Sequence, residues 1–240
     1  MNSDIVIVSA ARTPIGAFQG ALSSVTAPDL GATTIKAVIA RSGVDKDQID
    51  EVLMGNVLSA GVGQAPARQA ALNAGLSQAT SATTIGKVCG SGMKSVMLAF
   101  DQIKAGSIEL AIAGGMENMS LAPYFLPKAR AGQRLGHGEI VDHMFYDGLQ
   151  NAYDGQLMGC FADANSMADK ITREHMDDYA IESLKRAQLA TSRGYFDDEI
   201  SPVTYQTRKG DITVNTDESP QNAVIEKITK LTPNLSKEGT

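Results

Sequence analysis

Short apolar runs alternate with helical segments in the first half of the chain, and this order limits the folds that it can adopt. The first, residues 5–8, is continuous and rich in β-branched residues, as in a strand buried on both faces of a sheet; the other strand candidates are residues 51–57, 83–88 and 110–113. Helical segments that end at glycine lie between them, at residues 28–43, 66–74 and 93–105. Strands joined through helices form right-handed crossovers, so the order predicts an α/β fold with a mostly parallel sheet and helices on both faces.

The character of the sequence changes near Glu117. Residues 117–147 contain prolines, glycines and scattered charges, which favour loops. After them come helical stretches and then short strand candidates, at residues 161–171, 173–193, 203–206 and 211–214. We therefore predict two domains, an α/β domain of residues 1–118 and a loop or cap domain of residues 119–240.

Composition narrows the class of protein. A chain of 240 residues with 43% hydrophobic residues can bury a substantial core, and a net charge of −6 argues against a nucleic-acid partner. The two cysteines, Cys89 and Cys160, form no CxxC pair, which favours a reducing compartment. No N-terminal targeting pattern and no apolar stretch of membrane-spanning length are seen, so we expect a soluble, cytoplasmic protein with no membrane association. Cysteine and histidine do not cluster at ligand spacing, so no metal site is predicted.

Cys89 lies where a predicted strand passes into a predicted helix through small residues, in the sequence V-C-G-S-G-M of residues 88–93. The helix repeats apolar residues at a spacing that predicts a face turned into a core: Met93, Val96, Met97, Phe100 and Ile103. At a helix N-terminus, unpaired N–H groups and the helix dipole favour a thiolate and an oxyanion. From the residues alone, a reactive cysteine and a buried structural cysteine are about equally supported.

Four motifs resemble signatures of the thiolase family. Residues 88–94 resemble the family's nucleophile motif, and residues 9–16 its first strand and the turn that follows. The other two signatures are resembled by residues 63–70 and by residues 113–120. In addition, residues 147–159 resemble the start of the family's substrate-covering loop domain. The matches occur in the family's order along the whole chain, which makes them more specific together than any one alone.

The resemblance implies a thiolase-like layered fold with an inserted loop domain and with the C-terminal repeat half absent from this chain. It implies that Cys89 takes an acetyl group from acetyl-CoA as a thioester, and that the enolate of a second acetyl-CoA attacks it to give acetoacetyl-CoA, or the reverse. The family's activating histidine and second cysteine come from the C-terminal half, so this chain alone is expected to be incomplete for turnover. Coenzyme A thioesters are the implied substrates, no covalently bound cofactor is implied, and the implied assembly is a homo-oligomer, a dimer of dimers.

The resemblance also assigns residues that contact the substrate or coenzyme A, and these are Leu149, Leu157, Met158 and Gln221. Leu157 begins a Leu-Met-Gly triplet where short-chain members have His-Met-Gly, and the bulk of Met158 fits a short acyl chain. Gln221 falls near an arginine that often holds the adenine end of coenzyme A. Gly86 stands where the family often has asparagine.

Two alternatives stay open at this point: a longer-chain 3-ketoacyl-CoA thiolase, and a non-catalytic subunit or fragment that binds coenzyme A or a partner. Residues 122–138 favour either an oligomerisation arm or a mobile surface loop. We expect Cys160 to be a small buried residue and the histidines to lie on solvated surfaces; these are His137, His143 and His175.

Overall fold

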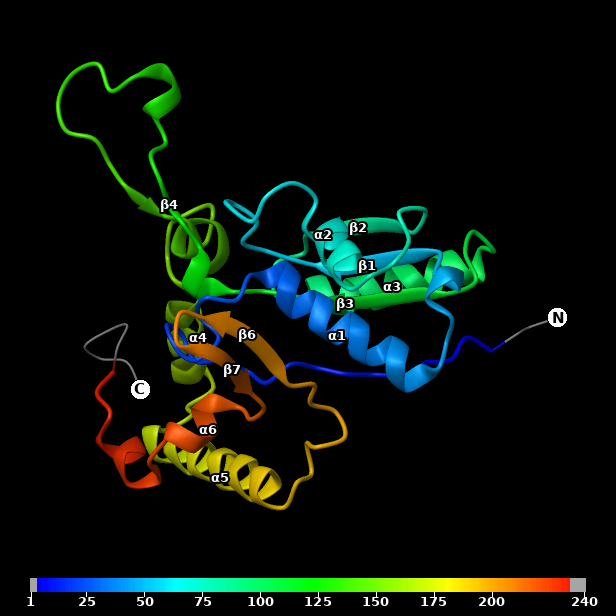
Figure 1. The fold of residues 1–240 in the computed structure, drawn as a ribbon. Coiled ribbons are helices and arrows are strands. Elements are labelled where there is room, and N and C mark those ends of the chain that lie inside the picture. The colour runs from blue at the N-terminus through cyan, green and yellow to red at the C-terminus, as the bar shows by residue number, and fades with distance from the viewer. Residues whose placement is uncertain (1–3, 234–240) are drawn as a thin grey trace.

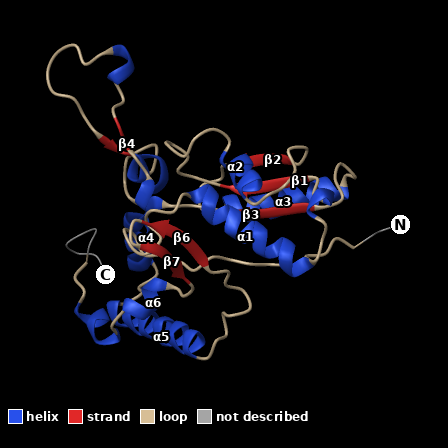
Figure 2. Ribbon diagram, viewed as in Figure 1, coloured by secondary structure: helices blue, strands red, loops and turns tan. Residues whose placement is uncertain are grey.

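The computed structural model describes residues 4–233, and its centre is a three-stranded parallel sheet. The strands stand in the order β2 (Ser81–Ile85), β1 (Glu51–Gly55) and β3 (Ala111–Gly115). Helices α1 (Ala27–Ser42) and α2 (Pro66–Asn73) lie on one side of the sheet, and α3 (Ser91–Lys104) lies on the other (Figures 1 and 2). The predicted α/β class, with a parallel sheet and helices on both faces, is confirmed.

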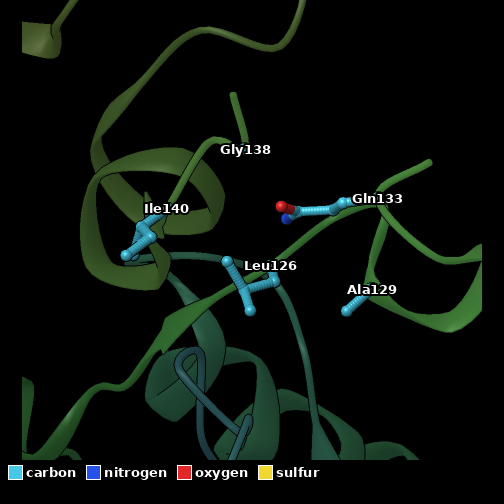
Figure 3. Close-up of a pocket in the computed structure, with 5 residues that line it drawn as sticks. All are labelled: Leu126, Ala129, Gln133, Gly138 and Ile140. Atoms are coloured by element: carbon cyan, nitrogen blue, oxygen red, sulfur yellow. The ribbon is translucent and has the colours of Figure 1, made fainter. Parts of the chain in front are cut away.

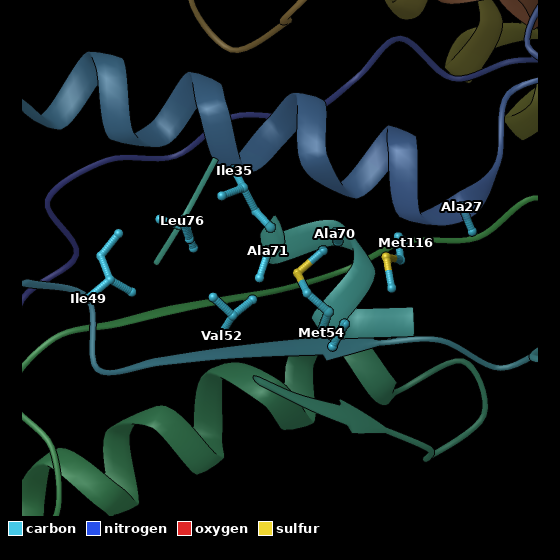
Figure 4. Close-up of a cluster of buried hydrophobic side chains, with 10 residues drawn as sticks. Ala27, Ile35, Ile49, Val52, Met54, Ala70, Ala71, Leu76 and Met116 are labelled. Carbon is cyan, nitrogen blue, oxygen red and sulfur yellow. The ribbon is translucent and has the colours of Figure 1, made fainter. Parts of the chain in front are cut away.

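The α1–α2 side of the sheet holds the main core (Figure 4). Val52 and Met54 point to this side because alternate residues of a strand face opposite ways. They pack against residues of both helices and of the flanking loops, and the buried cluster is completed by Ala27, Ile35, Ile49, Ala67, Ala70, Ala71, Leu76 and Met116. Helix α1 begins and ends as predicted, since the side chain of Thr26 accepts the N–H of Asp29 and Gly43 closes the helix at a φ of 68°.

The prediction of a strand at residues 5–8 was wrong. Val6, Ile7 and Val8 are 68%, 82% and 60% exposed, and the backbone there belongs to no strand. Figure 1 shows this first segment running past α1 outside the sheet. Apolar content favours a strand, but the strand forms only where a neighbour supplies its hydrogen bonds; here the first pairing is a single bridge between Arg12 and Ile200.

The direction predicted for α3 was also wrong. Its buried residues are the small ones, Ser91, Ser95 and Ala99, which lie against the sheet. Most of the apolar stripe faces outward instead: Met93 is 74% exposed, Val96, Met97 and Phe100 are about half exposed, and Ile103 is partly buried. The periodicity found the stripe correctly, but small side chains allow the closer approach of helix to sheet and therefore decided which face is buried here.

Residues 119–233 lie beyond the end of β3, at the end of the sheet where the strands finish (Figure 1). An arm, residues 126–140, projects from the paired strands β4 (Tyr124–Phe125) and β5 (Val141–Asp142). A π-helical turn, Met144–Leu149, follows β5. The remaining elements are α4 (Met158–Ala168), α5 (Arg173–Ser192), the antiparallel pair β6 (Val203–Thr207) and β7 (Gly210–Val214), and α6 (Glu218–Asn222). Short 3₁₀ turns occur at Lys46–Gln48, Met119–Leu121, Ala129–Ala131 and Ile225–Lys230.

A second, smaller apolar cluster joins the two parts of the chain. Leu22, Val25 and Leu30 come from the N-terminal side and pack with Val203 of β6. This cluster crosses the predicted boundary at residue 118, and the division into two domains stays a prediction. Among the described residues, no helix combines the length and the apolar character needed to cross a membrane.

Candidate active site at the carboxyl edge of the sheet

Cys89 is exposed on a tight turn between β2 and α3. Ser91, the first residue of α3, closes this turn with its side chain, because its Oγ accepts the N–H of Lys87 at 2.8 Å and donates to the carbonyl of Val88 at 2.6 Å. The N–H of Gly90 donates to the carbonyl of Lys87 at 3.0 Å. Ser91 therefore holds the loop in a fixed shape around the cysteine.

The residue before the cysteine has a strained backbone. Val88 has a φ of 45°, in the left-handed region that a β-branched residue rarely adopts. Such a conformation costs on the order of 1–3 kcal/mol and persists only where the surroundings impose it, which is common at functional sites. The strain turns the chain sharply at the end of β2 and leaves the Cys89 side chain on the surface.

Glycines bring the first turn of α3 against the ends of two strands. A Cβ on Gly55, at the end of β1, would lie 2.7 Å from the backbone of Ser91 and Gly92, and a Cβ on Gly115 would lie 3.3 Å from Gly92 Cα. Cys89 is therefore held at the carboxyl edge of a parallel sheet, where α/β proteins bind ligands. No side chain caps the N-terminus of α3 among the described residues. The N–H of Ser91 donates to the carbonyl of Val88 at 3.1 Å, so the N–H groups that can face a negative charge are those of Gly92 and Met93.

Three of the predicted substrate residues come together in the fold. Leu149 ends the π-helical turn, the next residue, Gln150, forms an antiparallel bridge with Leu157, and Met158 begins α4. We call residues 144–158 the covering segment. No hydrogen bond joins it to Cys89 among the described residues, and the roles of these residues stay predictions.

Gln221 lies elsewhere, on α6, where it lines a pocket of about 280 Å³ with Phe196 and Asp217. A larger hollow of about 420 Å³ lies on the arm, with Leu126, Ala129 and Ile140 along its wall (Figure 3). Neither pocket includes Cys89. Cys160 is partly exposed, so the prediction that it is buried was only partly right.

The sequence reasoning missed His143, which was predicted to lie on a solvated loop and is 6% exposed. Its Nδ1 lies 2.5 Å from a carboxylate oxygen of Asp147, and its Nε2 accepts the N–H of Ala60 at 3.3 Å. The spacing of four residues between His143 and Asp147 was the available signal, since it places the two side chains on one side of a helical turn.

Glu117 was also missed, although it lies inside one of the motifs. Its carboxylate accepts hydrogen bonds from Asn56 Nδ2 at 2.8 Å, from the N–H of Val57 at 2.7 Å and from the N–H of Leu58. Burial raises the pKa of Glu117, and this effect outweighs the opposing hydrogen bonds, which lower it. Glu117 is thus a partly buried carboxylate that joins the loop after β1 to the end of β3.

Two acidic residues hold the N-terminal motif in place: Asp217, just before α6, and Glu218, the first residue of α6. Arg12 donates to both carboxylate oxygens of Asp217, at 2.7 and 2.9 Å, and to Glu199 at 2.6 Å. The carboxylate of Glu218 accepts the N–H groups of Ala17 and Ala21, each at 2.9 Å. The motif of residues 9–16 is therefore tied to the C-terminal part of the described chain.

Comparison with known proteins settles the family. The family model described as "Thiolase, N-terminal domain" matches residues 5–240. The chain belongs to the thiolase family. Curated relatives are longer than this thiolase chain and carry the name acetyl-CoA acetyltransferase. The protein of Cupriavidus necator is 49% identical over 240 residues, which are 99% of this chain and 61% of that protein.

Two further relatives give the same result. The acetyl-CoA acetyltransferase of Escherichia coli K12 is 50% identical over 237 residues, 98% of this chain and 60% of that protein, and that of Saccharomyces cerevisiae is 47% identical, over 95% of this chain and 58% of that protein. The thiolase chain thus spans about three fifths of the length of these relatives. The resemblance inferred from the four motifs is confirmed.

Proposed function

We propose that Cys89 is the acyl-accepting nucleophile of an acetyl-CoA acetyltransferase. The observation that carries the proposal is the exposed thiol on a strained turn at the uncapped N-terminus of α3. The Cys89 thiolate attacks the carbonyl carbon of acetyl-CoA, the C–S bond to coenzyme A breaks, and the coenzyme A thiolate leaves and takes up a proton. The N–H groups at the start of α3 favour the negative charge that develops on the carbonyl oxygen.

The second half of the reaction needs a base to remove the α-proton of a second acetyl-CoA. His143 is not available, because both of its ring nitrogens are engaged. His137 and His175 are exposed. The family resemblance assigns the catalytic histidine and second cysteine to a C-terminal half, so we propose that residues 1–240 acquire the acyl group but do not sustain turnover alone.

The acetyl group is the favoured substrate in this proposal. The relatives reported above are named for it, and Met158 would limit the length of the acyl chain, with Leu149 and Leu157 beside it. Gln221 would face the adenine end of coenzyme A. Transfer of longer acyl groups, as in a 3-ketoacyl-CoA thiolase, is the alternative, and competition between acetyl-CoA and a longer acyl-CoA for Cys89 separates the two.

The partners that we propose are a C-terminal half and further copies of the chain. The exposed stripe of α3 needs an apolar cover, which a C-terminal half would supply. The arm presents apolar side chains that fit contact between copies in a dimer of dimers, with Leu135 97% exposed. Two free cysteines suit a reducing compartment such as the cytoplasm.

The experiment is the intact mass of the protein after incubation with acetyl-CoA, with peptide mapping of any adduct. Wild-type protein and the Cys160→Ala control are expected to gain one acetyl group on Cys89, and Cys89→Ala none. An adduct that survives in Cys89→Ala would place the nucleophile elsewhere. Acetoacetyl-CoA cleavage is then measured with and without a separately supplied C-terminal half; turnover by residues 1–240 alone would contradict the need for that half.

A further inference from the structure

We propose that His143 is a positioning residue that fixes the covering segment against the edge of the sheet where Cys89 lies, and so sets the depth of the acyl pocket. This inference rests on the proposed function of Cys89. It assigns a role to a buried histidine that takes no part in the chemistry.

The contacts of the imidazole ring define its state. The N–H of Ala60 points at Nε2, so Nε2 carries a lone pair and the ring proton lies on Nδ1, which donates to Asp147. His143 is 6% exposed, so a ring that lost either bond would leave one of its own nitrogen atoms buried and unpaired. Asp147 is half exposed and could turn to water instead. The ring thus ties the π-helical turn to the loop that follows β1.

Beneath the ring, Glu117 ties the same loop to the sheet. It follows β3 and accepts hydrogen bonds from Asn56 and Val57, which follow β1. The N–H of Asn56 donates to the carbonyl of Ile85, the last residue of β2, at 3.1 Å, and the turn of Cys89 starts one residue later. The ends of all three strands therefore meet at this junction, and Cys89 is part of the same edge.

Packing joins the junction to the covering segment. A Cβ on Gly148 would lie 3.2 Å from a methyl group of Leu58, so the π-helical turn sits directly on the loop after β1. The backbone N–H of His143 donates to the carbonyl of Pro123 at 3.1 Å. The rings of Phe125 and Tyr146 pack edge to face, with their centroids 5.8 Å apart. Among the described residues, His143 is the one side chain that hydrogen-bonds both to the turn and to the loop after β1.

The position of the π-helical turn in turn determines where the predicted pocket residues of the covering segment lie. Leu149 ends the turn that begins one residue after His143, and the bridge between Gln150 and Leu157 places Leu157 and Met158 beside it. A shift of the turn would therefore move all three pocket residues together. By contrast, Cys89 is held by Ser91 and would keep its own geometry.

Two substitutions separate the two ring contacts. His143→Asn keeps a donor near Asp147 and removes the acceptor of the Ala60 N–H, whereas His143→Gln places an amide where Nε2 stood and is expected to restore that acceptor. His175→Asn is the matched control, because His175 is exposed. Asp147→Ala is the second variant, since it removes the acceptor of the Nδ1 proton and leaves the buried ring and its bond from Ala60 in place.

The first measurement is hydrogen exchange of the full chain by mass spectrometry. In His143→Asn, peptides from residues 144–158 are expected to exchange about tenfold faster than in wild type, with peptides of α2 and α5 unchanged, and His143→Gln is expected to recover most of the protection. Unchanged exchange at residues 144–158 would overturn the proposal. If His143→Asn loosens the whole chain, Asp147→Ala is judged by the same two outcomes: faster exchange confined to residues 144–158 supports the proposal, and unchanged exchange there overturns it.

The second measurement reads the pocket without coenzyme A. Cys89 is alkylated with iodoacetamide and with a long N-alkyl iodoacetamide, and the ratio of the two rates is compared between variants. In His143→Asn, the rate of the long reagent relative to iodoacetamide is expected to rise several-fold, on the order of the change in local opening. The positioning role would be overturned if residues 144–158 exchange faster while this ratio of rates stays the same. Failure of wild-type protein to take up an acetyl group would instead count against the proposed function of Cys89 and would leave both readouts of His143 intact.

Discussion

The sheet with its helices and the region after β3 are held together in different ways. Between residues 27 and 116, ten buried apolar side chains form a single cluster. In the later region, α4, α5 and α6 contain no buried residue, and the contacts that secure it are largely polar: Arg12 with Asp217, Glu218 with the N-terminal turn, and His143 with Asp147. Apolar burial is largely independent of pH, whereas ion pairs and charged hydrogen bonds are not. The two regions should therefore respond differently to the same disturbance.

The largest effect is expected in the apolar core. Ile35 is 1% exposed between α1 and the sheet, so Ile35→Ala should lower the free energy of unfolding by about 2–5 kcal/mol through lost burial and a cavity. Val96→Ala on the exposed stripe of α3 is the control and should cost far less. Urea unfolding followed by circular dichroism measures both; equal losses would mean that the stripe is covered in solution, for instance by a second copy.

A backbone contact gives the next effect. A Cβ on Gly55 would meet the backbone of Ser91 and Gly92, which cannot move independently of α3, so Gly55→Ala should cost about 1–3 kcal/mol or more. It should also change the rate at which iodoacetamide labels Cys89. Gly86→Ala is a close control in the adjacent turn, because nothing lies within 4 Å of its Cβ position. A destabilised Gly86→Ala with an unaffected Gly55→Ala would contradict this packing.

In the later region we expect a smaller effect that depends on pH. Burial acts to raise the pKa of Asp217, but the hydrogen bonds from Arg12 and from the N–H of Ile15, with the charge of Arg12, outweigh it and lower the pKa below its ordinary value. A lowered pKa in the folded state means that Asp217 contributes stability above its ordinary pKa and loses it as the pH falls through the folded value. Asp217→Asn should therefore cost about 1–2 kcal/mol at pH 7 and much less near pH 3. Proteolysis of residues 195–222 at the two pH values measures this, and a loss independent of pH would show that the ion pair contributes little.

The smallest effect on stability is expected at the covering segment. Leu157→His should change the free energy of unfolding by less than about 0.5 kcal/mol, because Leu157 is only partly buried. It should instead alter the rate at which acetyl-CoA acylates Cys89, since the side chain is proposed to border the substrate. A lower melting temperature with unchanged acylation would identify Leu157 as a packing residue.

Much of the α/β unit could be predicted from the sequence because its signals are local. Glycine stops and short apolar runs each act within a few residues, and the strands and helices between residues 27 and 115 formed close to the predicted bounds. Helix α5 likewise begins after Thr172, whose side chain accepts the N–H of His175. The position of Cys89 at the start of a helix followed from the same local signals.

Other features could not be predicted because they depend on contacts between distant residues. The run at residues 5–8 has the composition of a strand, yet strand formation needs a neighbour that composition does not supply. His143 lies in a charged stretch, and only the approach of Ala60, from 83 residues earlier, buries and orients it. Arg12 and Asp217 are 205 residues apart in the sequence, and nothing near either residue indicates the other.

By itself, the sequence determined the α/β class, the family and the place of Cys89 on a turn between a strand and a helix, because these follow from residue types within short windows. Only the tertiary structure decided which face of α3 is buried, how glycines bring its first turn against the strand ends, and how His143 and Glu117 join the three strand ends to the covering segment. The physical reason is that burial and hydrogen-bond satisfaction belong to pairs of surfaces, and a pair is defined only once the chain has folded.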